Sequence, residues 1–415
     1  MGLGYVGLPL ACEFAKIGFS VTGFEVDPSK VKSLLAGKSY VGDIESREIR
    51  DLVKSKRLTA TTDFSKLHAM DAIIICVPTP LNKTKDPDIS YIDQAARKAR
   101  QALRSGQLII LESTTYPGTT RDNVLPLFQG KGLNVGKDFY LAFSPERIDP
   151  GNKNFKLANT PKVVGGITRT CQDLAVTLYS QIVEQVIPVS SAEAAEMTKI
   201  LENTFRAVNI GLVNEFMMIC DKLGLSVWEI IEAASTKPYG YMPFYPGPGL
   251  GGHCIPIDPH YLSWKMKSLN FPARFIELAG EINSHMPDFV VTKVMKALNG
   301  RKKSIKGSKI LVLGVAYKAN VSDMRESPAL DVIHLLLQMG SNVTYHDPYV
   351  PSIMIGSHRL NNQPYSPRLL NSADAVIITT PHSVFNPKDI LKHSKLVIDS
   401  RNMLHGLNAA HLVRL

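Results

Sequence analysis

The first 187 residues alternate short apolar runs with amphipathic stretches. The apolar runs have the length of strands and are rich in Val, Ile and Leu, which predicts buried strands of a parallel sheet at 20–27, 72–78, 108–114, 140–146 and 162–166. Helical patterns such as 90–104 lie between them. The alternation predicts a doubly wound α/β domain over residues 1–187.

The pattern changes near residue 191. From 191 to 225 proline is absent and Gly224 follows the last predicted turn, which predicts one long helix. Its apolar residues recur at three- or four-residue spacing: Met197, Ile200, Leu201, Phe205, Val208, Leu212 and Phe216. This length favours a spine between domains or a dimer interface over an ordinary core helix, and we expect a central helical domain over 188–300.

A second α/β pattern follows a polar, basic linker at 301–308. Its predicted strands lie within 309–318, 342–348, 374–381 and 395–402. The predicted organisation is therefore two Rossmann-like domains, 1–187 and 301–415, joined by the central helical domain. The apolar runs are too short to cross a membrane, so we expect no membrane partner.

Composition narrows the classes of ligand. The 415 residues include 47 basic and 37 acidic ones, for a formal net charge of +10. No nucleic-acid-binding motif accompanies this charge, so we expect anionic small molecules such as nucleotides, and not nucleic acid, as ligands. The five cysteines are scattered and form no CxxC pair, which argues against a disulfide framework or metal site and for a reducing cytoplasm.

A glycine motif near the start predicts a dinucleotide site. Gly2, Gly4 and Gly7 follow the G-x-G-x-x-G pattern, whose glycines allow a tight turn, close approach of a pyrophosphate and helix–strand packing. The helix predicted over 8–17 would direct its first amides at the phosphates. Glu25 ends the next strand, where a carboxylate binds ribose hydroxyls and repels a 2′-phosphate, so the pattern favours NAD over NADP. The alternative for Glu25 is a solvated turn residue.

One element of this motif is missing. The fingerprint normally follows a strand, but only Met1 precedes Gly2. We therefore expect an interrupted sheet in the first domain, and a truncated or misassigned start of the chain.

Several polar residues lie where catalytic groups are expected. Lys199 and Asn203 are four residues apart on the long helix and could hold an oxyanion, although a solvent-facing pair has the same spacing. Thr114, Thr115 and Glu146 lie at carboxyl ends of predicted strands, where parallel sheets bind ligands.

The segment GPGLGGHCIPIDP, residues 247–259, surrounds one thiol with glycine and proline. Such a loop lets backbone amides approach a substrate, and a cysteine is an effective nucleophile. Cys254, in a NAD enzyme, therefore indicates aldehyde oxidation through a thioester. We interpret the other thiols, Cys12, Cys76, Cys171 and Cys220, as core residues.

Six ordered blocks resemble the UDP-glucose/GDP-mannose dehydrogenase family. They are GLGYVGLPLA (2–11), ESTTYPGTT (112–120), SPERIDPG (144–151), EMTKILENTFRAVNI (196–210), GPGLGGHCIPIDP (247–259) and GVAYKANVSDMRESPA (314–329). Members oxidise the C6 alcohol of a nucleotide sugar to a carboxylate in two NAD-dependent steps. The resemblance implies a UDP-sugar substrate, a nucleotide-binding second α/β domain, and a homodimer or higher homo-oligomer built on the central helix.

The resemblance also implies roles for individual residues. Cys254 would be the nucleophile, Asp258 would aid proton transfer, Lys199 and Asn203 would stabilise the oxyanion, and Thr114 and Glu146 would order water, with Glu146 as candidate base. The implied cofactor contacts are Gly2, Gly4, Tyr5, Val6, Gly7, Glu25, Thr79, Thr114 and Arg325. The implied substrate contacts are Glu146, Arg147, Lys199, Asn203, Tyr245, Gly251, Lys318 and Arg401, of which Arg401 could instead meet a partner subunit.

Departures from the family pattern narrow the substrate. Ile257 replaces the lysine of the CxPKD segment found in glucose enzymes, His253 precedes the thiol, and SPERIDPG replaces SPEFLREG. These variants are similar to the N-acetylhexosamine branch, within it to UDP-N-acetylglucosamine 6-dehydrogenases. Glu25 stands where relatives often carry aspartate. UDP-ManNAc and UDP-Glc are alternative substrates.

Two alternatives of another kind stay open. A two-electron dehydrogenase related to β-hydroxyacid enzymes would share the first domain and the Lys199–Asn203 pair but would not need Cys254. A non-catalytic relative that binds nucleotide sugars would be consistent with the missing strand.

Overall fold

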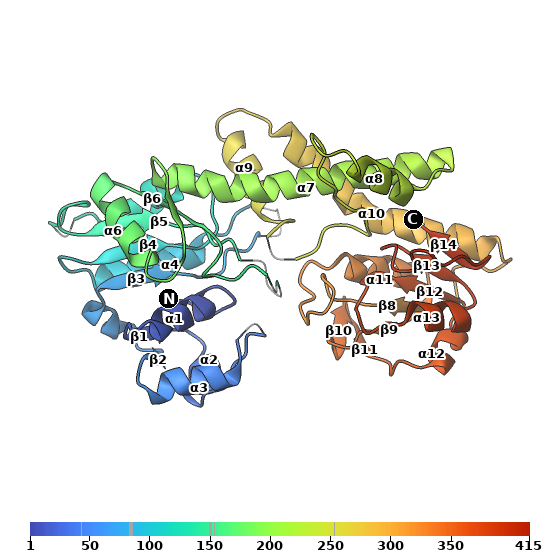
Figure 1. Cartoon of the computed structure of the whole chain (residues 1–415), viewed down its shortest axis with the longest axis horizontal. Coiled ribbons are helices and arrows are strands. Elements are labelled where there is room, and N and C mark those ends of the chain that lie inside the picture. Colours follow the sequence, from blue (N-terminus) through green and yellow to red (C-terminus); the bar gives the residue numbers. More distant parts are fainter. Residues whose placement is uncertain (43, 83–85, 131, 149–151, 153, 253) are drawn as a thin grey trace. The chain divides into compact units, whose positions relative to one another are not determined.

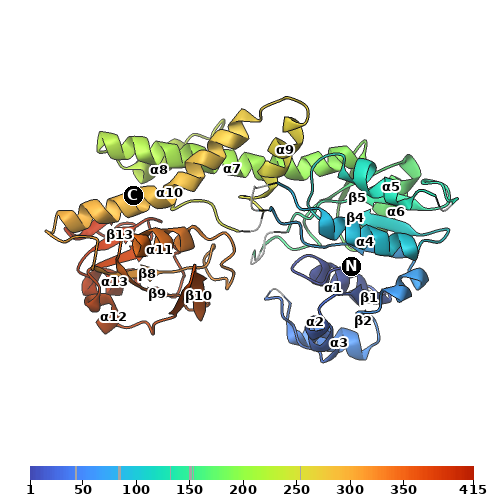
Figure 2. The same cartoon turned by 180° about the vertical axis from the view of Figure 1, so that it is seen from behind.

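The computed structural model describes the chain except residues 43, 83–85, 131, 149–151, 153 and 253. It divides into two compact units: Met1–Glu202 with His260–Pro272, and Asn203–Pro259 with Ala273–Leu415. The mixed α/β architecture confirms the predicted fold class (Figures 1 and 2).

The first unit contains a sheet in two pieces. Among the described residues, β1 (Val21–Phe24) pairs with β2 (Leu58–Thr61), and a separate sheet has the order β3–β4–β5–β6–β7. The strands of the second piece are β3 (Ala72–Ile75), β4 (Leu108–Leu111), β5 (Tyr140–Phe143), β6 (Lys162–Gly166) and β7 (Val186–Pro188). Between the pieces, Met1 N donates to Ile74 O at 2.7 Å and Gly2 N donates to Phe24 O at 2.8 Å. The predicted interruption of the sheet is confirmed.

The helices of this unit cover both faces of the larger sheet (Figure 1). Alternate residues of a strand point to opposite faces, so Ile109 packs with α4 (Ser90–Gln101), whereas Ile110 packs with α1 (Gly7–Lys16) and α6 (Arg169–Tyr179). The remaining elements are α2 (Pro28–Leu35), α3 (Ser46–Lys54), η1 (Phe64–Ala69), η2 (Thr119–Val124) and α5 (Leu125–Phe128).

One predicted strand direction is wrong. Strand β6 runs antiparallel to β5, with Ala142 opposite Gly166, where we expected parallel pairing. Parallel neighbours need a crossover, usually a helix, and the described residues between β5 and β6 contain none. The chain therefore turns back beside β5. This return places Lys162, the first residue of β6, among the strands that carry Glu112 and Glu146.

The predicted long helix is confirmed as α7 (Ala192–Leu223). Ser191 Oγ accepts a hydrogen bond from Ala194 N at 3.2 Å, and Gly224, at φ +68°, follows its last turn. Its residues up to Glu202 belong to the first unit and those from Asn203 onward belong to the second. Helix α9 (Asp258–Lys267) likewise begins in the second unit and continues in the first.

The second unit is built on a sheet of order β14–β13–β12–β8–β9, whose pairs are parallel. Its strands are β8 (Lys309–Leu313), β9 (Asn342–His346), β12 (Ala375–Ile378), β13 (Val397–Asp399) and β14 (Leu412–Arg414). A hairpin adds β10 (Ser352–Ile355) and β11 (His358–Asn361). The helices are α8 (Val227–Ser235), α10 (Arg274–Asn299), α11 (Pro328–Gln338), α12 (Pro367–Ser372) and α13 (Pro387–His393).

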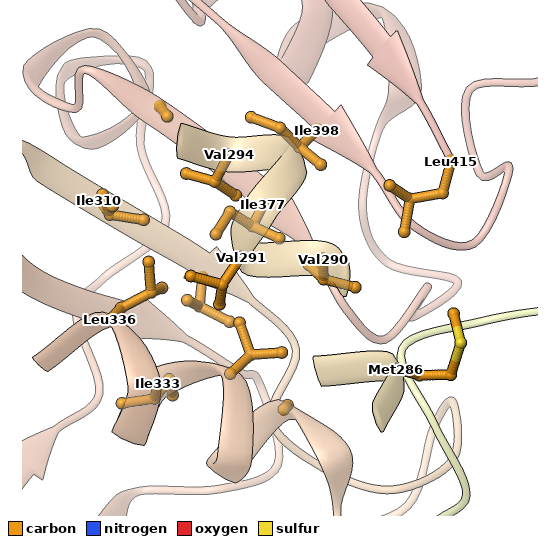
Figure 3. Packing of buried hydrophobic residues seen from close by; sticks show 14 of the residues in the cluster. Met286, Val290, Val291, Val294, Ile310, Ile333, Leu336, Ile377, Ile398 and Leu415 are labelled. Atoms are coloured by element: carbon orange, nitrogen blue, oxygen red, sulfur yellow. The ribbon is translucent and has the colours of Figure 1, made fainter. Parts of the chain in front are cut away.

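The core of this unit lies on both faces of the sheet. On one face, Val291 and Val294 of α10 pack with Ile310 and Ile377, as Figure 3 shows. The next residue of β8, Leu311, packs on the other face with α12 and α13. Trp228 of α8 donates a hydrogen bond to Leu415 O at 2.8 Å, which joins α8 to the end of the chain.

Candidate active site

The glycine motif of the first unit has the geometry of a dinucleotide cradle. A Cβ added at Gly7 would lie 1.9 Å from Gly2 O, so the turn and the start of α1 can pack only around a glycine. A Cβ added at Gly4 would meet nothing within 4 Å, which leaves room for a pyrophosphate beside the backbone. The residues present therefore fit NAD. Tyr5 is exposed and Val6 is half-buried in the same turn.

Glu25 is buried at the end of β1, so the alternative of a solvated turn residue is wrong. Its Oε2 accepts a hydrogen bond from Leu3 N at 2.9 Å, and its Oε1 accepts one from Val26 N at 2.9 Å. Lys30 Nζ lies 3.7 Å from Oε2. These contacts fix the carboxylate beside the glycine turn, where it can meet ribose hydroxyls.

The threonines predicted for the site follow strands β3 and β4. Thr79 is buried, and its carbonyl oxygen accepts a hydrogen bond from Tyr261 Oη at 2.7 Å. Thr114 is half-buried, whereas Thr115 is buried and its hydroxyl is bonded to that of Thr119 at 2.6 Å. Thr114 is thus the more accessible hydroxyl of the pair.

Glu146 is held as a carboxylate just after β5. Its Oε1 accepts hydrogen bonds from Arg147 N at 2.8 Å and Ile148 N at 2.6 Å, and Lys162 Nζ lies 3.6 Å from Oε2. Burial opposes ionisation, but the charge of Lys162, a hydrogen bond with the Glu112 side chain, the Ile148 amide and the charge of Lys199 together outweigh it and lower the pKa of Glu146. A base must be deprotonated, so the site suits the predicted role.

Two cationic residues near this carboxylate, Arg147 and Lys199, differ in what surrounds their own side chains. Arg147 forms a two-pronged ion pair with Glu202 of α7, with Nη2 2.6 Å from Oε1 and Nε 3.3 Å from Oε2. Lys199 is only 8% exposed, and Asn203 only 5%, so the alternative of a solvent-facing pair is wrong.

In the second unit, Asn203, Asp258 and the Cys254 loop meet. Asn203 Nδ2 donates to Asp258 Oδ2 at 2.5 Å, and Asp258 N donates to Cys254 O at 2.8 Å. Asn203 and Asp258 are buried, while Cys254 is half-buried and belongs to none of the apolar clusters. His253 lies outside the described residues.

Two buried amides that were not predicted from the sequence anchor the start of this loop. Asn214 of α7 donates to Asn283 Oδ1 of α10 at 2.8 Å, and Gly247 N donates to Asn214 Oδ1 at 2.9 Å. The two asparagines are 69 positions apart, so spacing could not reveal the pair. Asparagine inside an apolar helical stripe was the available signal, because a buried amide needs a hydrogen-bond partner.

The end of the loop contacts the second α/β domain. Gly252 N donates to Arg325 O at 3.2 Å, and a Cβ added at Gly251 would lie 2.8 Å from the side chain of Tyr317, next to Lys318. The guanidinium of Arg325 pairs with Asp323, with Nη2 2.6 Å from Oδ2. The predicted substrate residues Gly251 and Lys318 are thus carried by neighbouring segments.

Arg401 and Tyr245 lie at the other end of the loop. A Cβ added at Gly247 would lie 2.1 Å from Arg401 Nη1, so the guanidinium lies against the backbone there. Tyr245 is 57% exposed and its ring is stacked on Trp228, with centroids 6.4 Å apart.

The four cysteines other than Cys254 are buried or half-buried. All five cysteines are described and none forms a disulfide; Cys12, Cys171 and Cys220 are buried, and Cys76 packs at the edge of an apolar cluster. Within the described residues, no group of three or more His, Cys, Asp or Glu could hold a metal ion, and no helix is long and apolar enough to cross a membrane.

Comparison with protein families gives matches to three domain models along the chain. Models of the UDP-glucose/GDP-mannose dehydrogenase family match residues 1–183 (NAD binding domain), 193–285 (central domain) and 311–406 (UDP binding domain). The chain belongs to this family. It is a nucleotide-sugar dehydrogenase whose cofactor is NAD, as the resemblance implied.

Individual relatives span nearly the full chain. A UDP-N-acetyl-D-mannosamine dehydrogenase of Pyrococcus horikoshii is 37% identical over 412 residues, covering 97% of this chain and 95% of the relative. A UDP-N-acetyl-D-glucosamine 6-dehydrogenase of Pseudomonas aeruginosa is 33% identical, covering 93% and 90%. A solved UDP-D-ManNAc dehydrogenase from Pyrococcus horikoshii has a TM-score of 0.91 and 34% identity, covering 100% of this chain and 97% of that one.

Proposed function

We propose that the chain catalyses the NAD-dependent, four-electron oxidation of the C6 alcohol of a UDP-N-acetylhexosamine to the uronic acid, in the cytoplasm. The observation that carries this proposal is the meeting of Asn203, Asp258 and the Cys254 loop in the second unit. A two-electron dehydrogenase needs no nucleophile, whereas a second oxidation at the same carbon needs a covalent or hydrated aldehyde.

The chain's residues would act in sequence. NAD, when bound, would accept one hydride, so the two oxidations use two molecules of NAD in turn. Loss of a hydride from C6 and of a proton from its hydroxyl leaves an aldehyde. Sγ of Cys254 would add to it: the thiol gives up its proton, a C–S bond forms, and the C=O double bond becomes a single bond to an oxyanion. Lys199 and Asn203 would stabilise the oxyanion of this thiohemiacetal. Loss of a second hydride gives a thioester.

Water then cleaves the thioester and restores the thiol. Glu146 would take a proton from this water while Thr114 orients it, and Asp258 would move protons at the thiol and C6 oxygen. The lowered pKa of Glu146 supports its role, because the group must be ionised before water attacks. The products are the carboxylate and the free enzyme.

The proposed substrate is UDP-GlcNAc, which the loop variants around Ile257 favour. UDP-ManNAc is the second candidate, because a dehydrogenase of that name is 37% identical to this chain. Arg147, Tyr245, Gly251, Lys318 and Arg401 are proposed to bind the sugar nucleotide, and Tyr5, Val6, Thr79 and Arg325 to join the glycine motif in holding NAD.

We also propose a homodimer. On the described part of α7 in the second unit, Phe205, Leu212, Phe216, Ile219 and Leu223 are exposed large apolar residues. Their spacing puts them on one side of the helix. A row of this kind marks an interaction surface, and a second copy of α7 offers the same apolar row.

A substrate panel tests the proposed function. NADH formation is compared for UDP-GlcNAc, UDP-ManNAc, UDP-Glc and GDP-Man under one set of conditions. The highest kcat/KM is expected with UDP-GlcNAc, and a higher value with UDP-ManNAc would select the second candidate. Preference for UDP-Glc or GDP-Man would refute the N-acetylhexosamine proposal, and UDP-sugar binding without NADH would support a non-catalytic relative.

A further inference from the structure

A buried group of charges lies beneath Glu146 in the first unit, and the proposed mechanism does not use it. Lys162 of β6 forms an ion pair with Glu112, the residue after β4, and both side chains are almost wholly buried. The hydroxyl of Tyr179, on α6, donates to the other oxygen of Glu112 at 2.6 Å. Lys162 Nζ also lies 4.9 Å from the centre of the Tyr179 ring.

Burying a charge is costly unless partners compensate it. The ion pair with Glu112 and the ring of Tyr179 compensate the charge of Lys162. Burial opposes that charge, but Glu112 and Glu146 outweigh burial and raise the pKa of Lys162. Burial raises the pKa of Glu112 to about 7, against the opposing effects of Lys162 and Tyr179. Below pH 7 Glu112 is mostly protonated, so in that range Lys162 has one ionised carboxylate to balance, which is Glu146.

We propose that Lys162 is a positioning residue that keeps Glu146 ionised and fixes its Oε2. Three contacts carry this inference, which rests on the proposed function of Glu146 as base. Lys162 Nζ is 3.6 Å from Oε2, while Oε1 is held by the Arg147 and Ile148 amides. Oε2 is buried and accepts no hydrogen bond within the described residues, so a lone pair remains for a water that reaches it.

Other charged and titratable groups also act on this cluster. They come from each element packed around it: the amino group of Met1, Cys76 after β3, Glu112 after β4, Lys162 on β6, Tyr179 on α6 and Lys199 on α7. Lys162 and Lys199 are the cations among those that act on Glu146, and Lys162 has the larger effect. Removing Lys162 should therefore raise the pKa of Glu146.

The pH dependence of kcat for NADH formation tests the proposal. Activity is lost as falling pH protonates Glu146, so Lys162→Met should move this acidic limb to higher pH by about 1–3 units, the range for one nearby charge. Lys162→Arg should keep the limb near its wild-type position. KM for the UDP-sugar should change little, because Lys162 is proposed to act through Glu146 rather than on the substrate.

Two further variants separate this effect from loss of structure. Glu112→Gln/Lys162→Met removes both charges of the buried pair, so it should unfold less readily than Lys162→Met. Its acidic limb should still lie at higher pH than that of the wild type. Lys293→Met breaks the Lys293–Asp221 pair in the second unit and should leave the limb in place. If Lys162→Met does not fold, the pH dependence of kcat is measured on the double variant instead.

The outcomes are distinguishable from failure of the proposed function. If the wild type forms no NADH with any UDP-N-acetylhexosamine, the proposed function fails. If the wild type is active and Lys162→Met, or the double variant, keeps the wild-type acidic limb, Lys162 does not hold Glu146 ionised and this inference is overturned.

Discussion

Asn203 donates a hydrogen bond from Nδ2 to Asp258 Oδ2 across 2.5 Å, although the two residues are 55 positions apart in the chain. Asn203 lies in the middle of α7, and Asp258 is the first residue of α9. Because Asp258 N also bonds to Cys254 O, the long helix fixes the turn that carries the thiol. The same amide thus serves the fold and the proposed oxyanion site.

Replacing Asn203 should therefore affect both stability and turnover. Asn203→Ala removes a donor from a buried carboxylate, which should lower the free energy of unfolding by about 1–3 kcal/mol. It should also lower kcat more than it changes KM for NAD. Urea unfolding and steady-state kinetics measure the two effects; unchanged kcat in a folded variant would remove Asn203 from the oxyanion site.

Glu25 should determine the choice of dinucleotide. Glu25→Gln keeps the size of the side chain but loses the negative charge that would repel a 2′-phosphate, and one oxygen that accepts backbone amides. We expect KM for NAD to rise about tenfold, equivalent to roughly 1.4 kcal/mol, and the preference for NAD over NADP to fall. Kinetics with both cofactors measure this, and an unchanged preference would contradict the assigned role.

The apolar row on α7 should hold two copies together. Phe216→Glu puts a charge in this row and should shift the protein from dimer to monomer in light scattering. Met354→Glu, at an exposed apolar residue of β10, is the matched control and should leave the mass unchanged. A wild-type protein that is monomeric at micromolar concentration would contradict the proposed dimer.

Glu112 should make stability depend on pH. Its pKa is raised from the ordinary value to about 7 by burial, so the folded state binds this proton more tightly than the unfolded state and wild-type stability falls as pH rises to 7. Glu112→Gln mimics the protonated form, so its stability relative to wild type should increase over this range, by on the order of 2–3 kcal/mol.

Chemical denaturation at pH 5 and pH 7 measures this difference. The wild-type-minus-variant difference cancels the other titrating groups that the two proteins share. Equal differences at the two pH values would show that Glu112 has an ordinary pKa in the folded protein.

Features carried by local spacing could be predicted from the sequence. The three-to-four periodicity of apolar residues gave α7 within a residue or two at each end, and Gly2, Gly4 and Gly7 were expected where the turn forms. The direction of β6 could not be predicted, because a short apolar run has the same sequence pattern in parallel and antiparallel pairs. Direction depends on the connection, which here lacks a crossover helix among its described residues.

Buried polar pairs were the other features that could not be predicted. Lys162 and Glu112 are 50 positions apart, and only the topology of β4 and β6 brings them together. A signal was present: a lysine opens the apolar run KVVGG, and a glutamate ends LIILE. Charged residues are almost never fully buried unless paired, so each of these positions implied a partner without naming it.

The ratio of NADH to uronic acid tests the central claim most directly. Wild-type protein is given limiting UDP-GlcNAc, or UDP-ManNAc if the substrate panel selects it, and both products are measured at completion. Two NADH per acid are predicted, with no acid from Cys254→Ala. One NADH per turnover, or normal acid formation by Cys254→Ala, would contradict a four-electron oxidation through the Cys254 thioester.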